Sequence, residues 1–360
     1  MTTQRPSSFL ESEIREQPEV LDRLLQSETE RVFELAQSLR NKGEDAGDRP
    51  YCFDYVVLAA RGSSDNAARY AQYLFGYHNR LPVSLATASL LTMYERPPRL
   101  ARALVIGISQ SGQSPDIVGV LAEARRQGQA TIAITNDPQS PLASAAEHLI
   151  PLGAGPEKSI AATKTYTLSL GALALLSAAL ENDRDRLNEL HKLPVIMERT
   201  FPPILAELHR VERYRYMSHC VVIGRGFNYA TAFEVALKIK ELTRTITEPY
   251  SSADFHHGPI AMVHRGFPIM LVAPSGAVID DIRQLVVTLK RLEAELLTIS
   301  DDADLLADAN LAFPIPEGLP EWLTPLVTVI PGQFFAMALA QARGLNADHP
   351  QGLKKVTETM

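Results

Sequence analysis

The chain has 360 residues, 46% hydrophobic and 21% charged, which suits one large globular domain or two medium ones. Its formal net charge of -7 argues against a broad nucleic-acid surface, and two distant cysteines, Cys52 and Cys220, exclude a disulfide framework. The first nine residues lack the apolar segment of a secretion signal, and the longest apolar run, at 168–180, is too short to span a bilayer. We therefore expect a cytoplasmic protein without a membrane or nucleic-acid partner.

In chain order, residues 9–40 are predicted to be helical and residues 41–50 to form a polar loop. Short apolar runs then alternate with helical patterns. The predicted strands are 55–60, 82–86, 103–108 and 130–135, and the predicted helices are 64–78, 87–94, 116–127, 141–146 and 163–180. Strands that alternate with helices indicate βαβ units and a mostly parallel sheet.

The pattern restarts in the second half, after a polar region at 181–193 and a helical segment that ends near Arg213. An apolar strand, Arg225-Gly226 and an alanine-rich helix at 233–243 repeat the earlier order of strand, Arg61-Gly62 and helix. Further strands are predicted at 268–273, 295–299 and 311–315, and a last helix at 331–343. We expect four parts: a helical segment (1–48), two α/β subdomains (49–193 and 194–345) and an irregular tail (346–360).

The most informative stretch follows the predicted strand 103–108: Ser109, Gln110, Ser111, Gly112, Gln113 and Ser114 precede a helix. Unpaired N–H groups at a helix start and serine hydroxyls together suit a phosphate, and Ser64 follows a neighbouring strand end. A plain helix cap, in which the serines only satisfy helix donors, is the alternative. Neither a P-loop nor a dinucleotide-binding glycine motif is present.

Three further groups of residues could carry chemistry. Glu234, Lys238 and Glu241 share one helix stripe, either as a solvated salt-bridge face or with Glu241 at a pocket where it moves a proton. His257, before Gly258-Pro259, is a structural loop histidine or an acid–base group. The tail lysines Lys354 and Lys355 are solvated, or one folds back and attacks a carbonyl.

Together these motifs resemble the sugar isomerase (SIS) family, over roughly residues 10–360, and in particular the isomerase portion of glutamine–fructose-6-phosphate aminotransferase. The elements that carry the resemblance are Ser109-Gln110-Ser111-Gly112, residues 157–164, Gly224-Arg225-Gly226, residues 236–241, His257-Gly258-Pro259 and Leu353-Lys354-Lys355. Each motif alone is weak evidence for the resemblance, whereas six motifs in the same order are strong evidence. The resemblance implies two tandem SIS subdomains of flavodoxin-like, three-layer form, and a homodimer that shares its active sites.

The resemblance also implies roles for individual residues. Glu241 would move a proton between C1 and C2 of the sugar, and His257 would open the ring from the neighbouring subunit. Lys355 could form a Schiff base with the open-chain ketose, and Lys238 would be a nearby lysine of the site. The remaining positions implied to contact substrate are Ser64, Ser109, Gln110, Ser111 and Ser114 at the phosphate, and Gly62, Ser63, Glu157, Ala161 and Ala162 elsewhere. No metal or cofactor is required.

Departures from the aminotransferase pattern favour a catabolic reaction. The first turn reads Arg61-Gly62-Ser63-Ser64, Ala162 replaces a serine, and no glutaminase motif precedes residue 50. These features are similar to those of stand-alone SIS-type glucosamine-6-phosphate deaminases, which release ammonia as fructose 6-phosphate forms. Another SIS isomerase or deglycase, acting on fructosamine or galactosamine phosphates, and a non-catalytic phosphosugar sensor remain as alternatives.

Overall fold

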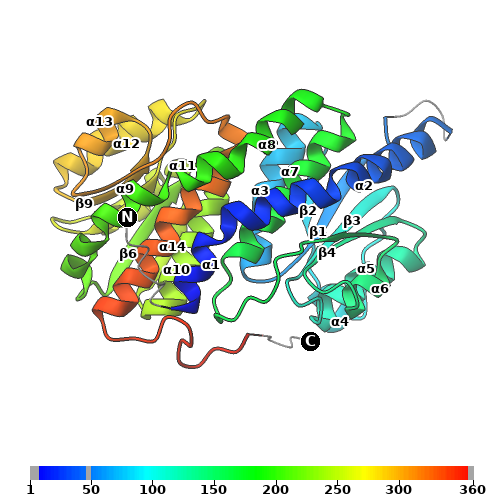
Figure 1. Ribbon diagram of the computed structural model, residues 1–360, viewed down its shortest axis with the longest axis horizontal. Coiled ribbons are helices and arrows are strands. Elements are labelled where there is room, and N and C mark those ends of the chain that lie inside the picture. Colours follow the sequence, from blue (N-terminus) through cyan, green and yellow to red (C-terminus); the bar gives the residue numbers. More distant parts are fainter. Residues whose placement is uncertain (1–7, 46–49, 356–360) are drawn as a thin grey trace. The chain divides into compact units, whose positions relative to one another are not determined.

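The computed structural model describes residues 8–45 and 50–355, and they form two compact units (Figure 1). One unit comprises Glu19–Glu157, Lys164–Lys192 and the end of the tail from Lys354, and we call it the first unit. The other, the second unit, comprises the chain up to Pro18, Lys158–Thr163 and Leu193–Leu353. The chain thus passes between the units at several points, whereas the domain boundaries expected from the sequence were contiguous and stay a prediction.

The first unit is built on a parallel sheet of five strands in the order β2-β1-β3-β4-β5. Its strands are β1 (Tyr55–Ala59), β2 (Val83–Leu85), β3 (Ala103–Ile108), β4 (Ala130–Thr135) and β5 (His148–Pro151). Its helices are α2 (Gln17–Asp45), α3 (Ser63–His78), α4 (Ser89–Thr92), α5 (Pro115–Arg126), α6 (Pro141–Ala145), α7 (Lys164–Leu180) and α8 (Arg184–Glu198), although α2 and α8 each run a few residues into the second unit. This strand order is that of flavodoxin-like folds.

The second unit repeats this order, because β10-β9-β8-β6-β7 is the same arrangement read from the other edge. Its strands are β6 (His219–Gly224), β7 (Ile246–Tyr250), β8 (Pro268–Val272), β9 (Glu295–Ser300) and β10 (Leu311–Pro314). Its helices are α1 (Phe9–Arg15), α9 (Phe201–Glu207), α10 (Tyr229–Thr243), α11 (Ser252–His256), α12 (Ile279–Arg291), α13 (Ala303–Ala307) and α14 (Thr324–Ala342), with short 3₁₀ helices at Leu208–Tyr214, Gly226–Asn228, Pro259–Met262 and Glu321–Leu323. The internal repeat and the parallel α/β architecture are confirmed.

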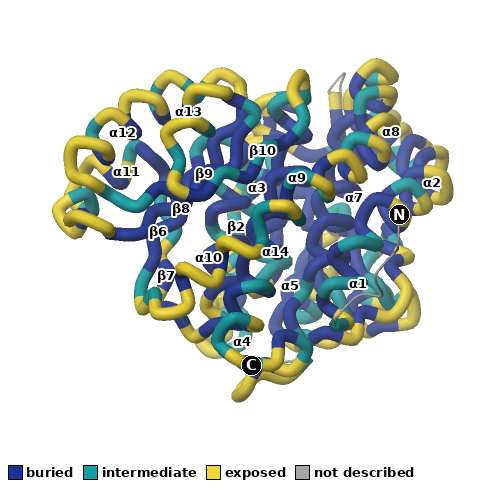
Figure 2. Tube along the Cα trace, turned by 60° about the vertical axis from the view of Figure 1, so that its left-hand side comes forward, coloured by how far each residue is buried: buried dark blue, intermediate teal, exposed yellow. Residues whose placement is uncertain are grey.

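Each sheet is covered on both faces, which explains why its central strands are apolar throughout. Every residue of α7 is buried (Figure 2). All six residues of β3 are buried as well. On one face of the first sheet, Val105 packs with Ile117 and Leu121 of α5, and Ile269 and Leu285 are the corresponding contact of the second sheet with α12. Parallel sheets need this double cover because neither face can be exposed to water.

Several boundaries differ from the sequence-based prediction. Residues 9–40 form two helices, separated at Glu16, and the polar stretch 181–193 is mostly helical because α8 begins at Arg184. The last helix begins at Thr324, and Pro331 lies inside it. The edge strands β5 and β7 and the helix α12 were not predicted at all. The end of the predicted tail, 356–360, lies outside the described residues.

Candidate active site

The hydroxyl-rich turn lies where the sequence placed it, between β3 and α5. Because β1 and β3 are neighbours while β2 lies on the other side of β1, this turn and the one after β1 flank the point where the chain order reverses. Ligands of open parallel sheets bind at the carboxyl ends of the strands beside such a point. Ser64 follows β1 and Ser109, Gln110 and Ser111 follow β3, so the structure brings these predicted phosphate contacts to one edge of one sheet.

The backbone of the turn is held rigidly. The Gln110 carbonyl accepts hydrogen bonds from the Asn136 amide at 3.1 Å and the Thr135 hydroxyl at 3.3 Å, both at the end of β4. Gly112 has φ +64°, and a Cβ atom there would lie 2.1 Å from Ser140 Oγ. Only glycine fits both the left-handed conformation and this close approach.

The serine hydroxyls do not act as a conventional helix cap. Ser114 is the N-cap residue of α5, yet its side chain makes no capping hydrogen bond. Ser109 Oγ accepts from the Gly112 amide at 3.1 Å and Ser111 Oγ accepts from the Gln113 amide at 3.3 Å. Both hydroxyls keep a hydrogen to donate, since a hydroxyl is donor and acceptor at once.

An ion pair that the sequence analysis did not single out lies beside this turn. Arg61, directly after the predicted strand end, contacts Asp116 with Nε 2.8 Å from Oδ2. Asp116 is fully buried in the first turn of α5, whereas half of the Arg61 side chain is exposed. The pair brings an exposed positive charge to the sheet edge that holds the hydroxyls. The sequence did contain a signal for this ion pair: Asp116 directly follows Pro115, which begins the helix.

The repeat reproduces this ion pair in the second unit. Arg225 follows β6 as Arg61 follows β1, and its Nη1 lies 2.6 Å from Oδ1 of Asp281 in the first turn of α12. Burial alone would raise the pKa of the Asp281 carboxyl, but hydrogen bonds from Ser252 and Arg225 hold it below its ordinary value. The two units therefore share an Arg–Asp pair as well as a strand order.

The stripe Glu234, Lys238 and Glu241 on α10 is buried rather than a solvated face. Lys238 Nζ lies 2.5 Å from Glu241 Oε2 and 3.5 Å from Glu234 Oε1. The side chains of Lys238 and Glu234 are 1% and 0% exposed, while that of Glu241 is 23% exposed. Helix α14 packs closely against α10 because Gly332 has no side chain, and a Cβ there would lie 2.3 Å from Val235. Of the two carboxylates in this stripe, Glu241 is thus the one that reaches solvent, and a buried ammonium fixes it.

The structure does not join His257 to this group. His257 is the first residue after α11, it is exposed, and its amide donates to the Asp254 carbonyl at 3.1 Å. Among residues 8–45 and 50–355, its imidazole makes no hydrogen bond or ion pair. A catalytic role for His257 therefore stays a prediction, in which His257 would act at the active site of a second subunit.

The two predicted site residues Glu157 and Lys355 contact each other in the first unit. Lys355 Nζ lies 2.7 Å from Glu157 Oε2, and the Glu157 side chain is completely buried. Glu157 also accepts from the amide and hydroxyl of Thr165, at 3.1 and 2.9 Å, at the start of α7. In this state both oxygens of Glu157 are used by the protein itself, and the tail lysine is docked rather than frayed.

The other predicted contacts divide between the units. Gly62, with φ +55°, and Ser63 form the start of α3 in the first unit. Ala161 is buried and Ala162 half-buried, and they lie on the 158–163 segment, which belongs to the second unit. The structure thus assembles a candidate phosphate site in the first unit and a candidate proton-transfer group in the second.

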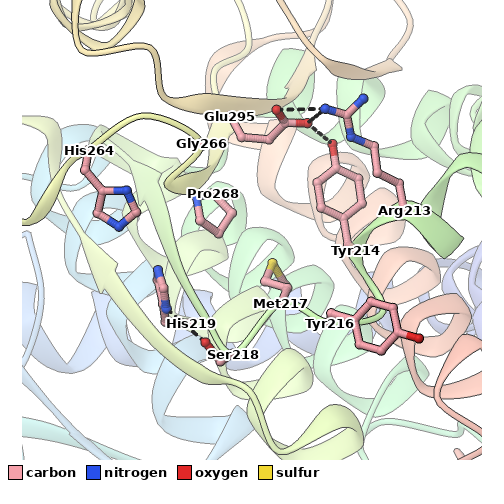
Figure 3. Close-up of a pocket in the computed structure, with 10 residues that line it drawn as sticks. All are labelled: Arg213, Tyr214, Tyr216, Met217, Ser218, His219, His264, Gly266, Pro268 and Glu295. Carbon is pink, nitrogen blue, oxygen red and sulfur yellow. Dashed lines mark hydrogen bonds and ion pairs between the residues drawn. The ribbon is translucent and has the colours of Figure 1, made fainter.

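A separate pocket of about 370 Å³ opens at the amino ends of β6, β8 and β9, the sheet edge opposite to Arg225 (Figure 3). Its charged groups already pair with one another: Glu295 contacts Arg213 Nη2 at 3.0 Å and accepts from the Tyr214 hydroxyl at 3.0 Å. The imidazoles of His219 and His264 lie 6.2 Å apart, centroid to centroid. None of the predicted site residues lines this pocket.

Within the described ranges, no cluster of three or more His, Cys, Asp or Glu side chains could hold a metal ion. One helical stretch in those ranges, Glu321–Ala342, is long and apolar enough to cross a membrane, but 94% of its apolar window is buried in the structure. Such burial is typical of the core helix of a globular domain.

The comparisons with known proteins agree on a family. The sequence profile of the SIS domain matches residues 51–179 and 215–342, one match for each half of the repeat. The isomerizing glutamine–fructose-6-phosphate aminotransferase of Pyrococcus horikoshii is 30% identical over 359 residues, which cover 96% of this chain and 57% of that protein. The chain therefore spans somewhat more than half the length of this relative.

Solved structures show the same fold. A candidate phosphosugar isomerase from Silicibacter pomeroyi DSS-3 is 30% identical with a TM-score of 0.81, over 95% of this chain and 100% of that one. A glucosamine-6-phosphate deaminase from Thermotoga maritima has a TM-score of 0.76 at 21% identity, over 98% and 100% of the two chains. The protein belongs to the SIS domain family.

Proposed function

We propose that this protein is a phosphosugar isomerase of the SIS family that deaminates an amino-sugar phosphate, glucosamine 6-phosphate being the preferred candidate. The observation that carries the proposal is the α10 pair: a partly exposed carboxylate, Glu241, held 2.5 Å from the buried Lys238 ammonium. A fixed carboxylate with access to solvent is what a proton shuttle between two neighbouring carbons requires.

The remaining residues supply binding. Ser64, Ser109, Gln110, Ser111 and Ser114 would hold the phosphate, with Arg61 adding positive charge at the same sheet edge. Phosphate contacts lie far from the reacting carbons, so their binding energy serves to position the sugar. The names of the aminotransferase relative and of the two similar structures support a phosphosugar of this kind.

The chemistry balances without a metal or redox cofactor. His257 would open the pyranose by acid–base catalysis, giving the 2-amino aldehyde. Glu241 would take the proton from C2 and return it to C1, which converts the amino aldehyde through an enolamine into a ketimine at C2. Water then adds to C2 and ammonia leaves, so glucosamine 6-phosphate and water give fructose 6-phosphate and ammonia. Lys355, once released from Glu157, could attack the open-chain carbonyl.

The deaminating direction rests on the departures at Arg61 and Ala162 from the aminotransferase pattern. Purified protein would be given glucosamine, galactosamine and fructoselysine-type 6-phosphates, and ammonia and ketose phosphate would be quantified. We expect turnover of glucosamine 6-phosphate. Turnover of a fructosamine phosphate alone would favour a deglycase, and binding without turnover would favour a sensor; either result overturns the proposal. A cytoplasmic homodimer belongs to the same proposal.

A further inference from the structure

Three segments of the second unit that are remote in sequence are tied together at one point. They are helix α1, the 158–163 segment that carries Ala161 and Ala162, and the tail that leads to Lys355. Asp348 contacts both of the others: its side chain caps α1 and its carbonyl accepts from the Ile160 amide at 3.0 Å. We propose that Asp348 is a positioning residue, which orders the catalytic tail and the substrate segment through helix α1. This inference rests on the proposed function.

The contact between Asp348 and α1 uses both carboxylate oxygens. Oδ1 accepts from the Leu10 amide at 2.8 Å and Oδ2 from the Phe9 amide at 3.1 Å. The Ser8 hydroxyl oxygen accepts a hydrogen bond from the Glu11 amide at 3.1 Å. Most of the otherwise unpaired N–H donors in the first turn of α1 are therefore satisfied. A carboxylate at a helix start also interacts favourably with the partial positive charge there. The helix and the tail therefore stabilise each other.

Helix α1 holds the 158–163 segment by a second, separate contact. The Glu13 carboxylate is 4% exposed and accepts from the Lys158 amide, the Ser159 amide and the Ser159 hydroxyl. Lys158 Nζ lies 4.8 Å from the centre of the Phe9 ring. The segment is thus fixed to α1 at one end and to the tail at Ile160, next to Ala161 and Ala162.

The tail itself is shaped to present Asp348. Asn346 Oδ1 accepts from the amides of Asp348 and His349 at 3.0 and 3.1 Å, which closes a tight Asx turn. Beyond Asp348, seven residues reach Lys355, a span of at most about 25 Å. Without the Asp348 carboxylate, the next side chain upstream that bonds to another element is the half-buried Arg343. Its guanidinium donates to the Thr243 carbonyl at 2.7 Å, and the twelve residues from Arg343 to Lys355 span at most about 40 Å. The remaining ties are the hydrogen bond from the Ile160 amide to the Asp348 carbonyl, the exposed bond from Arg244 to Gln351 and the ion pair of Lys355 with Glu157.

The test compares wild type with Asp348→Ala and Asp348→Asn, and with Asp304→Ala as the matched control. Asp304 is an exposed aspartate in the first turn of its own helix, α13, whereas Asp348 caps α1 from the tail. Limited trypsin digestion, read by the mass of the intact chain, would follow cleavage after Lys354 and Lys355. We expect cleavage there to be roughly tenfold faster in Asp348→Ala than in wild type, with Asp348→Asn between them and Asp304→Ala unchanged. A wild-type cleavage rate in Asp348→Ala refutes the proposal that Asp348 holds the tail in place.

Steady-state kinetics then test positioning. We expect kcat with glucosamine 6-phosphate to fall about tenfold in Asp348→Ala while KM stays within about twofold, because the phosphate contacts are untouched. Faster tail cleavage with an unchanged kcat refutes the positioning role. If wild type releases no ammonia, the proposed function fails, whereas the digestion result still decides whether Asp348 holds the tail.

Discussion

Lys355 Nζ lies 2.7 Å from Glu157 Oε2, and Glu157 is buried while the lysine is one-quarter exposed. An ammonium paired with a buried carboxylate is not a nucleophile, so Lys355 must leave Glu157 and lose a proton before it can attack a carbonyl. The docked tail is consequently a resting arrangement in the proposed reaction.

Lys355 has two proposed roles, the ion pair with Glu157 and the attack on the sugar carbonyl, and a substitution by arginine separates them. Arginine preserves the charge and the contact with Glu157 but cannot form a Schiff base. If Lys355 attacks the sugar, Lys355→Arg should lose activity by at least about a hundredfold while melting like wild type. Borohydride trapping with fructose 6-phosphate, followed by mass spectrometry of the tail peptide, checks the same point; wild-type activity in Lys355→Arg would eliminate the nucleophilic role.

The assignment of Glu241 predicts a loss of chemistry without a loss of binding. Glu241→Gln should lower kcat by about 10²–10⁴-fold, the usual contribution of a positioned acid–base group. Binding of the sugar phosphate, measured by calorimetry, should persist. Glu248→Gln, an exposed glutamate on β7, is the control and should behave like wild type. Retained turnover in Glu241→Gln would remove it from the mechanism.

Lys238 should be needed for folding as well as for catalysis. Replacing it with methionine leaves the fully buried Glu234 carboxylate without this cation, at a cost of about 3–5 kcal/mol in the free energy of unfolding. The double variant Lys238→Met/Glu234→Gln removes both charges and should recover a large part of that loss. Urea unfolding of both variants measures the difference, and equal destabilisation of the two would contradict the interaction.

The turn after β3 can be tested with two glycines. Gly112→Ala incurs both the positive φ and a clash with Ser140, whereas Gly128→Ala incurs only the positive φ of +73° in open space. We expect Gly128→Ala to cost about 1 kcal/mol and Gly112→Ala to cost about 1–3 kcal/mol more. Only Gly112→Ala should also weaken phosphosugar binding. Equal effects on affinity from the two variants would argue against a phosphate site at this turn.

The sequence was a good guide where periodicity and turn chemistry act locally. It located β1, β3, β4 and the serine-rich turn, since a buried parallel strand is a continuous apolar run. It missed β7, because Ile246–Tyr250 contains Glu248 and Pro249, which are tolerated only because β7 is an edge strand. The sequence-based prediction placed the start of α14 at Pro331, because proline is common at helix starts. This helix is apolar on every side, so no periodicity marks its true beginning at Thr324.

The sequence predicted which residues belong to the candidate site, but not which of them contact each other. Spacing put Glu234, Lys238 and Glu241 on one stripe, but burial depends on α14, which packs against α10 at Val235 from almost a hundred residues away in the sequence. The Glu157–Lys355 contact and the three contacts of Asp348 join segments that are about two hundred or more residues apart in the sequence. Such pairings leave no local signal in a single sequence.

The pH dependence of stability should carry a contribution from His78. Burial, with a further effect of Arg186, lowers the pKa of His78 to about 4 in the folded protein. Below about pH 6.5 the unfolded chain binds a proton that the folded chain does not, so stability is complete above pH 6.5 and decreases as the pH falls toward 4. His78→Gln should flatten the melting temperature over that window, and an unchanged slope would show that other groups set it.

The most direct measurement of the central claim follows glucosamine 6-phosphate labelled with deuterium at C2, by NMR and an ammonia assay. Wild type should release ammonia and fructose 6-phosphate in equal amounts, with part of the deuterium transferred to C1, and Glu241→Gln should do neither. Ammonia release that persists in Glu241→Gln, or sugar phosphate that binds to wild type and stays intact, would contradict the account.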